Sequence, residues 1–100
     1  MERKVYLTRL RPEFREEYLH AHRNVPSKLM DRYRDAGMRS CAVYLLEDYL
    51  VLVTEADDHS KVKAALENDP VDVEWQELMR PMKEEGDYRE MTEVFKADLS

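Results

Sequence analysis

The sequence predicts an α+β fold of the ferredoxin-like βαββαβ type, a four-stranded antiparallel sheet with helices on one face. The main observation is the order of the hydrophobic periodicities, which runs strand, helix, strand, strand, helix, strand along the chain. The second is size, because 100 residues of which 43% are hydrophobic suit one core. The third is continuity, since no repeat, linker or low-complexity segment divides the chain. We therefore expect a single domain over residues 1–100.

The first strand and first helix are indicated by a change of period. Val5 and Leu7 alternate with more polar neighbours within residues 4–10, which predicts a strand. A helix then begins at Pro12, because proline suits the first turn and acidic residues follow near the positive helix end. Apolar or half-apolar residues recur at helical spacing along it, namely Phe14, Tyr18, Ala21, His22 and Val25.

This helix is predicted to be interrupted at residues 24–26. Pro26 lacks an N–H and disfavours helical geometry in the residue before it, so a kink or short break is expected. The apolar pattern resumes at Leu29. Gly37 is suited to end the element in a left-handed turn.

A hairpin is predicted for residues 40–47 and 49–55. Both segments are rich in Val, Leu and Tyr, and only a very short acidic joint separates them. Successive apolar residues over 50–53 indicate a sheet that is covered on both faces. Because the helices cover only one face, a second copy of the chain is the simplest cover for the other, and we expect a homodimer.

The second half of the chain predicts a helical region and a closing strand. Asp57 or Asp58 can cap the helix, whose apolar pattern continues beyond Pro70. Gly86 ends the region. The last strand is expected over residues 91–95.

Charge and composition exclude several classes of partner and location. The net charge is −6, with 22 acidic against 16 scattered basic residues, so nucleic acid is not an expected partner. No apolar run approaches the ~18 residues of a membrane span, and no membrane association is expected. Cys41 is the only cysteine, and the start of the chain lacks the apolar core of a secretion signal. A cytoplasmic protein is predicted.

The most informative pair of residues is Tyr18 and His22. Residues four apart on a helix are stacked neighbours, so both groups should project from the apolar face of the first helix. They could be ordinary core residues, or they could bring a proton-transfer group into a cleft.

The remaining candidates do not form a metal or cofactor site. His20 should face away from His22, and His59 falls at a predicted helix start, so the histidines make no ligand cluster. Only two glycines are present, without a glycine-rich phosphate loop. We expect no metal and no organic cofactor. Cys41 is most simply a small buried apolar residue rather than a nucleophile.

Several short motifs follow one another over nearly the whole chain. They are KVYLTRLRPEFREEYLHAH with its E-Y-x-x-x-H step, then Gly37 and SCAVYLLED, and finally EWQELM and TEVF. In this order and spacing the chain resembles the L-rhamnose mutarotase family. The resemblance implies ferredoxin-like subunits paired into a dimeric α+β barrel. It also implies an isomerase of carbohydrate metabolism that interconverts the α and β anomers of a six-carbon deoxy sugar without metal or cofactor.

The resemblance also implies site residues. His22 is the implied catalytic residue, and Tyr18 is implied to help hold the sugar. Imidazole chemistry suits anomer exchange, because a group with a pKa near ~6.5 can give and take protons at neutral pH. Trp75 offers a flat face for the C–H side of a pyranose, although it could equally fill the core. The expected substrate-binding set is Tyr18, Trp75, Cys41, Tyr44 and Tyr6.

Three departures from the family pattern bear on the substrate. Cys41 stands where the family usually has tyrosine, Glu74 replaces the first of two tryptophans, and Val25 replaces a tryptophan before Pro26. Each change removes an aromatic or hydroxyl group that could line a sugar pocket. L-rhamnose or a related reducing sugar is the expected substrate, with a preference unlike that of members with the full aromatic set.

Two readings of a different class stay open on the sequence. One is a noncatalytic ligand-binding or dimerisation module on the same scaffold, which the aromatic losses favour. The other is a small dimeric-barrel oxygenase acting on an aromatic or porphyrin ligand.

Overall fold

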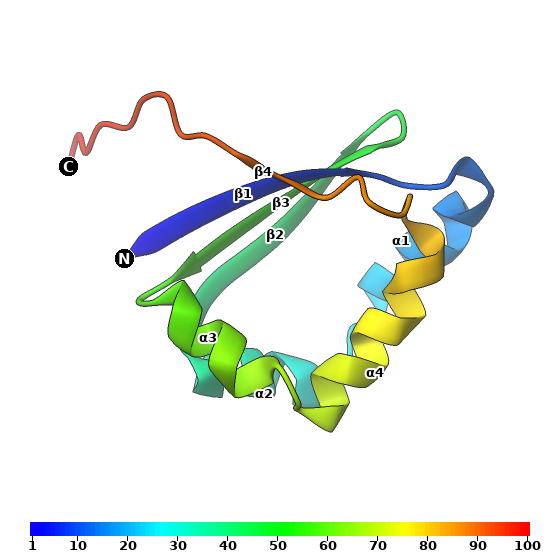
Figure 1. The fold of residues 1–100 in the computed structure, drawn as a ribbon, viewed down its shortest axis with the longest axis horizontal. Helices are drawn as coiled ribbons and strands as arrows, with labels where there is room; N and C mark the ends of the chain where they lie inside the picture. Colours follow the sequence, from blue (N-terminus) through cyan, green and yellow to red (C-terminus); the bar gives the residue numbers. More distant parts are fainter.

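The computed structural model describes all 100 residues and confirms the ferredoxin-like class. Its antiparallel sheet has the strand order β2-β3-β1-β4, and the helices lie on one side of it (Figure 1). The strands are β1 (Glu2–Arg9), β2 (Met38–Leu46), β3 (Tyr49–Ala56) and β4 (Arg89–Met91). The helices are α1 (Arg15–Arg23), α2 (Ser27–Ala36), α3 (His59–Leu66) and α4 (Pro70–Met79), with short 3-10 turns η1 (Pro12–Phe14) and η2 (Arg80–Met82). None of the helices is both long enough and apolar enough to cross a membrane.

The strand register separates the sheet into two faces, because residues paired directly across strands share a face. The face towards the helices carries Cys41, Val43 and Leu45 of β2, Leu50, Leu52 and Thr54 of β3, and Lys4, Tyr6 and Thr8 of β1. The opposite, helix-free face carries Ala42, Tyr44 and Leu46, then Tyr49, Val51 and Val53, then Val5, Leu7 and Arg9. Both faces are therefore largely apolar, as the run over residues 50–53 predicts.

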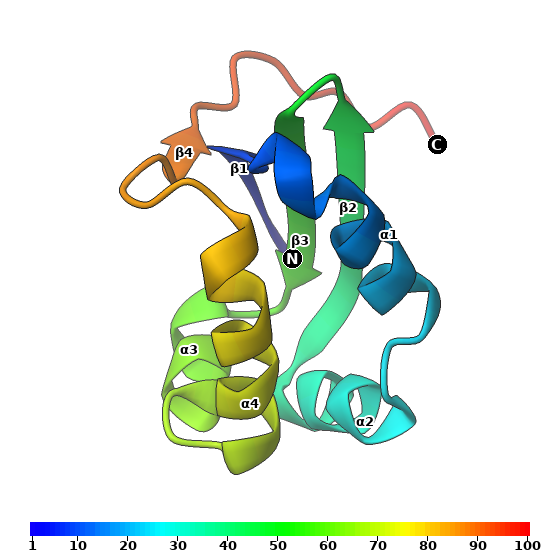
Figure 2. The same ribbon diagram turned by 90° about the vertical axis from the view of Figure 1, so that its right-hand side faces the viewer.

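The interruption near Pro26 is a complete break between two helices. α1 ends at Arg23, and Asn24 Nδ2 donates to the His20 carbonyl at its end. α2 starts directly after Pro26 and changes direction, as Figure 2 shows. Gly37 then closes α2 with φ 105°, and its N–H donates to two carbonyls of the last turn. The predicted left-handed terminator is confirmed.

The hairpin and the second helical region also form where predicted. A tight turn with Glu47 at φ 54° joins β2 and β3. The cap of α3 is Asp58, which accepts from the Ser60 N–H at 3.0 Å. Asp57 instead pairs with Arg39. A second cap at Asp69 starts α4, so the predicted helical region consists of two helices.

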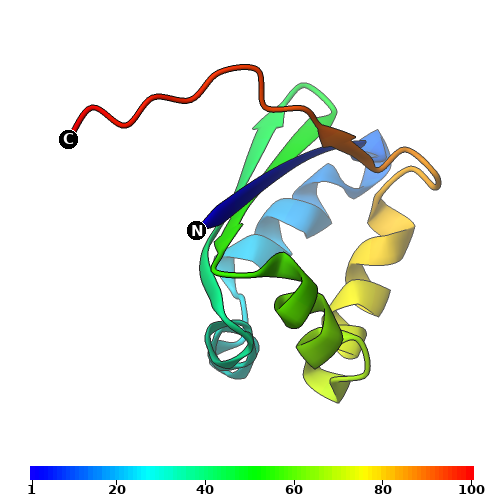
Figure 3. The same cartoon turned by 60° about the vertical axis from the view of Figure 1, so that its left-hand side comes forward.

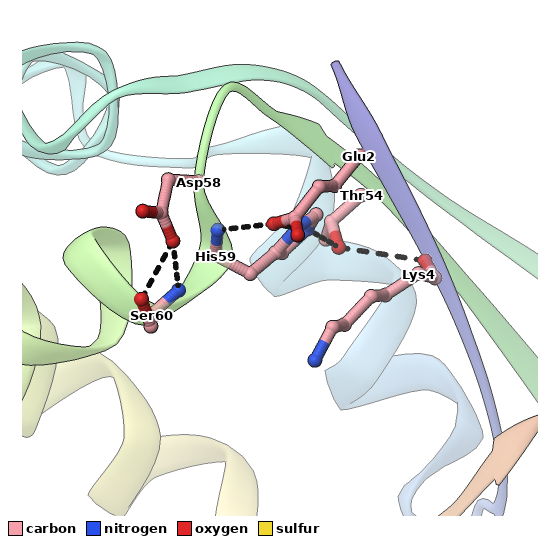
Figure 4. Close-up of polar contacts among 6 residues, drawn as sticks. All are labelled: Glu2, Lys4, Thr54, Asp58, His59 and Ser60. Carbon is pink, nitrogen blue, oxygen red and sulfur yellow. Dashed lines mark hydrogen bonds and ion pairs between the residues drawn. The ribbon is translucent and has the colours of Figure 1, made fainter.

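The first residues of β1 are tied to the start of α3 through a histidine (Figure 4). Glu2 Oε1 accepts from the His59 N–H at 2.7 Å and lies 3.3 Å from His59 Nδ1. On the other side of the ring, Nε2 lies 3.0 Å from Thr54 Oγ1 of β3. The His59 side chain is only 12% exposed. It therefore acts as a connection between one helix and two strands.

The closing strand is shorter than predicted. β4 pairs with β1 over three residues only, and the chain beyond Met91 leaves the sheet, as Figures 1 and 3 show. The prediction of a strand through residues 91–95 is wrong for its apolar end. Val94 and Phe95 are 94% and 83% exposed, because no strand or helix of the same chain lies against them.

The compact core occupies one end of the space between sheet and helices. Its buried members are Leu10, Tyr18, Leu50, Met79 and Met82, with Trp75 and Phe14 among the residues packed around them. The remaining space is not filled by side chains. It forms the cavity described next.

Candidate active site

A large cavity lies between the helices and the helix-facing side of the sheet. Its volume is about 1620 Å³, and half of its lining comes from hydrophobic side chains. Its wall includes Tyr18 and His22 of α1, Cys41 of β2 and Trp75 of α4. The structure thus brings together four residues that the sequence places on three different elements. A concave, mostly apolar space with a few polar groups is the usual form of a small-molecule site.

The His22 ring is held in a defined orientation with one nitrogen free. Its Nδ1 lies 2.9 Å from the Tyr18 carbonyl oxygen. A carbonyl oxygen can only accept, so Nδ1 carries the proton and donates. No group of the chain bonds Nε2, which in the neutral ring is then a proton acceptor. This arrangement fits a general base that later returns the proton as an acid.

Two aromatic rings flank the imidazole. The Tyr18 ring centre lies 4.2 Å from that of His22, with the planes inclined by 31°. The Trp75 ring lies edge-on at 5.4 Å. Trp75 packs against the core and also lines the cavity.

Tyr18 presents a neutral hydroxyl to the cavity. Its side chain is 3% exposed, and the hydroxyl makes no hydrogen bond within the chain. Burial raises the pKa of this phenol, so it stays protonated at neutral pH. The group is available to donate a hydrogen bond to a ligand.

Cys41 is a free thiol on the cavity wall. Desolvation by its surroundings raises the thiol pKa. The thiolate needed for nucleophilic chemistry is therefore disfavoured. The prediction that Cys41 is buried is wrong, because it faces the open cavity and is exposed to solvent there. Of the other positions that depart from the family pattern, Val25 lines the cavity, whereas Glu74 is exposed and does not.

The structure does not bring Tyr44 to the cavity. It is 63% exposed on the helix-free face, because side chains alternate along β2 and Cys41 and Val43 take the cavity side. Residues three apart on a strand cannot share a face, so the strand period already separates Tyr44 from Cys41. Tyr6 does lie on the helix-facing side, but its ring stacks on Tyr88 at 4.9 Å and lines a smaller neighbouring pocket.

A second polar group of the cavity was missed by sequence reasoning. The Tyr33 hydroxyl of α2 donates to Asp72 Oδ1 of α4 at 2.8 Å, and Gln76 donates to the same oxygen at 3.2 Å. All three line the cavity. Burial and the Asp72 carboxylate raise the pKa of Tyr33. The spacing of Asp72 and Gln76 marks one helix face, but nothing local to Tyr33 signals its partner 39 residues away.

No group of three or more His, Cys, Asp or Glu side chains in the structure is placed to hold a metal ion. The other two histidines have surroundings different from those of His22. His20 is exposed on α1, and His59 is engaged with Glu2 and Thr54.

Comparison with known proteins places this geometry in context. The family model of L-rhamnose mutarotase matches residues 3–97. The crystal structure of an L-rhamnose mutarotase from Formosa agariphila superposes with a TM-score of 0.82 at 16% identity, covering 98% of this chain and 100% of that one. No curated protein sequence matches the chain.

Two further solved structures share the architecture. An antibiotic biosynthesis monooxygenase has a TM-score of 0.67 at 12% identity, covering 94% of this chain and 99% of its own. The tetracenomycin F2 cyclase of Streptomyces glaucescens has a TM-score of 0.62 at 19% identity, covering 100% and 99%. At these identities the likenesses show a common fold and nothing about activity.

Proposed function

Because the chain belongs to the L-rhamnose mutarotase family, and is thus a sugar mutarotase interconverting α and β anomers, we propose that His22 transfers the proton in this reaction. The observation that carries the proposal is the state of its ring. One nitrogen is fixed by the Tyr18 carbonyl, and the other is free in a cavity of suitable size. No finding favours a noncatalytic module or an oxygenase over this activity.

The reaction needs one proton to leave the anomeric hydroxyl and one to reach the ring oxygen. In the proposed sequence, His22 Nε2 accepts the proton of the anomeric hydroxyl, while the bond between C1 and the ring oxygen breaks. The bonding electron pair goes to the ring oxygen, which takes the proton from the imidazolium. The freed aldehyde rotates about its bond to C2, and the same steps in reverse close the ring on the other face.

Tyr18 and Trp75 are proposed to hold the sugar during these steps. The Tyr18 hydroxyl can donate to a sugar oxygen beside His22, since it has no partner in the chain. The indole of Trp75 offers an apolar surface to the C–H side of the ring. Cys41 and Val25 leave space where the family usually has larger aromatic residues, which supports a sugar preference different from that of typical members.

The proposal is tested by measuring anomer exchange with saturation-transfer NMR on a panel of reducing sugars, including L-rhamnose. His22→Ala should lower the exchange rate at least ~10²-fold, because general acid–base catalysis typically contributes this much. His20→Ala is the matched control, since His20 lies exposed on the same helix. Unchanged exchange in His22→Ala, with the dimer folded, would show that His22 is only a packing residue.

We also propose a homodimer formed through the helix-free face of the sheet. This face exposes Tyr44 and Leu46 beside the half-buried valines of β1 and β3, and no element of the same chain covers it. Light scattering should give twice the monomer mass at micromolar concentration, and Leu46→Glu should shift the mass towards the monomer. A stable wild-type monomer would contradict the proposal. A reducing cytoplasm is the proposed location, in keeping with the single free Cys41.

A further inference from the structure

Four cationic residues line the cavity, and none of them forms an ion pair with a carboxylate. Two of the four, Arg11 and Lys83, are half-buried, whereas Lys63 and Arg80 are exposed. Arg11 lies between β1 and η1, and Lys83 follows η2. Both are half-buried and line the cavity. Neither takes part in any ion pair of the structure, and most of these ion pairs involve exposed arginines.

Hydrogen bonds to backbone carbonyls hold Arg11 beside the chain at Met82 and Lys83. Arg11 Nε donates to the Lys83 carbonyl at 3.2 Å, and the Arg11 N–H donates to the Met82 carbonyl at 2.8 Å. An isolated antiparallel β-bridge also pairs Leu10 with Lys83. Figures 1 and 3 show the resulting approach of the end of β1 to the end of α4. The Arg11 guanidinium is thus fixed beside the main chain of Lys83, and both residues line the same cavity.

The pair lies at the same end of the cavity as Tyr18. Leu10 and Met82, the chain neighbours of Arg11 and Lys83, belong to the same core cluster as Tyr18. The Lys83 ammonium is 5.8 Å from the ring centre of Tyr88, which also lines the cavity. Burial lowers the pKa of Lys83, because no carboxylate offsets its lost hydration.

The carboxylates of the wall do not neutralise this pair. Asp72 of α4 already accepts hydrogen bonds from Tyr33 of α2 and Gln76 of α4. The other four are Glu13, Glu77, Glu84 and Glu85, and none is within ion-pair distance of Arg11 or Lys83. Three of these four are exposed to solvent, so their charge is screened.

We propose that Arg11 and Lys83 bind an anionic group of the sugar, so that the substrate class is an acidic reducing hexose. The inference rests on the proposed function of the same cavity. The anion must lie away from C1, because the anomeric hydroxyl has to be free. A carboxylate or a phosphate at C6 meets this condition, as in a hexuronate or a hexose 6-phosphate. A hexuronate differs from a 6-deoxyhexose only by a carboxylate in place of a methyl group, so it fits a cavity of the same size.

The test measures exchange rates by NMR on matched sets that differ only at C6. In the galacto series these are D-fucose, D-galactose, D-galacturonate and D-galactose 6-phosphate, and gluco and manno sets follow the same plan. Where a sugar is exchanged too slowly, its inhibition constant against L-rhamnose exchange replaces kcat/KM. The acidic member of at least one set should be preferred over its neutral counterparts by about tenfold or more. A preference for the hexuronate would identify the bound group as a carboxylate, and a preference for the 6-phosphate would identify it as a phosphate.

Variants assign this preference to the cation pair. Lys83→Met keeps the alkyl chain and removes the charge, and it should lower the acidic-to-neutral ratio of kcat/KM at least tenfold. Arg11→Gln should lower the same ratio. Lys61→Met removes one positive charge on the exposed surface of α3 and should leave the ratio unchanged. Added salt should lower the ratio in the wild type and have little effect on it in Lys83→Met.

The outcomes separate the two proposals. No preference for any acidic sugar, or a ratio that Lys83→Met leaves unchanged, overturns the role of the cation pair, even if neutral sugars are exchanged in a His22-dependent manner. If no sugar of the panel is exchanged faster by the wild type than by His22→Ala, the proposed function itself fails.

Discussion

His22 and His59 are both partly buried imidazoles, but the chain uses them in opposite ways. Both ring nitrogens of His59 are occupied, Nδ1 by Glu2 and Nε2 by Thr54 (Figure 4). His22 has Nδ1 on the Tyr18 carbonyl and leaves Nε2 to the cavity. A ring with two protein partners connects structural elements, whereas a ring with one partner is oriented and can still exchange a proton with a ligand.

The contrast extends to the surroundings of each ring. His59 lies at a helix start, between the first residues of β1 and the last part of β3. His22 lies between two aromatic rings on the wall of the cavity between the helices and the sheet. The difference predicts that mutation of one histidine changes activity and mutation of the other changes stability.

The largest expected effect is on the rate of anomer exchange. His22→Ala should reduce the rate at least ~10²-fold, while His59→Ala should change it less than about threefold. Saturation-transfer NMR on both folded variants measures this. Equal losses in the two variants would remove the distinction between them.

A smaller effect is expected for Tyr18→Phe. The carbonyl that orients His22 belongs to the backbone, so phenylalanine preserves this bond and removes only the hydroxyl. A rate loss of roughly 3–10-fold is expected, because one neutral hydrogen bond to the substrate is worth about 0.5–1.5 kcal/mol. A loss as large as that of His22→Ala would mean that the Tyr18 hydroxyl itself transfers the proton.

The free energy of unfolding should depend on His59, whereas the exchange rate should depend on His22. His59→Ala removes the contacts of the ring with Glu2 and Thr54 and should lower the free energy of unfolding by about 1–2 kcal/mol. Denaturant unfolding at fixed protein concentration measures this, with His20→Ala as the exposed control. An unchanged midpoint for His59→Ala would show that the connection is not stabilising.

The smallest expected effect is a change in how the stability of the fold depends on acidic pH. The His59 N–H donates to Glu2 and holds its carboxyl pKa below the ordinary value of 4.5. A lowered folded pKa means that this contribution is present above about pH 4.5 and is lost as the pH falls through the folded pKa. Glu2→Gln should therefore flatten the loss of stability in this acid range only. Unfolding midpoints between pH 3 and 7 test the difference, and parallel curves would contradict it.

Features that depend on neighbouring residues could be predicted from the sequence. The helix break at Pro26, the left-handed Gly37 and the hairpin follow from local backbone chemistry. The approach of Tyr18 and His22 follows from the helical repeat, and the chemical role proposed for them comes from the resemblance to a family. The face of Tyr44 could also have been predicted, because the strand period opposes it to Cys41.

Features that depend on distant segments could not be predicted in this way. The hydrogen bond of Tyr33 to Asp72 joins residues 39 apart, and that of Arg11 to Lys83 joins residues 72 apart. Neither pair has a local signature, because each depends on how helices and strand ends pack against one another. The exposed Val94 and Phe95 show the same limit, since β-propensity alone does not supply a partner strand.

The most direct test of the central claim is chemical rescue of His22→Ala by imidazole, measured as anomer exchange by saturation-transfer NMR. We expect exchange to fall at least ~10²-fold in the variant. Added imidazole should then raise the exchange rate of the variant, and the increase should saturate with imidazole concentration. This increase should exceed the rate that imidazole gives with sugar alone. It should also exceed the increase that imidazole gives with His20→Ala. Wild-type exchange by His22→Ala without imidazole would contradict the claim that His22 Nε2 carries the proton.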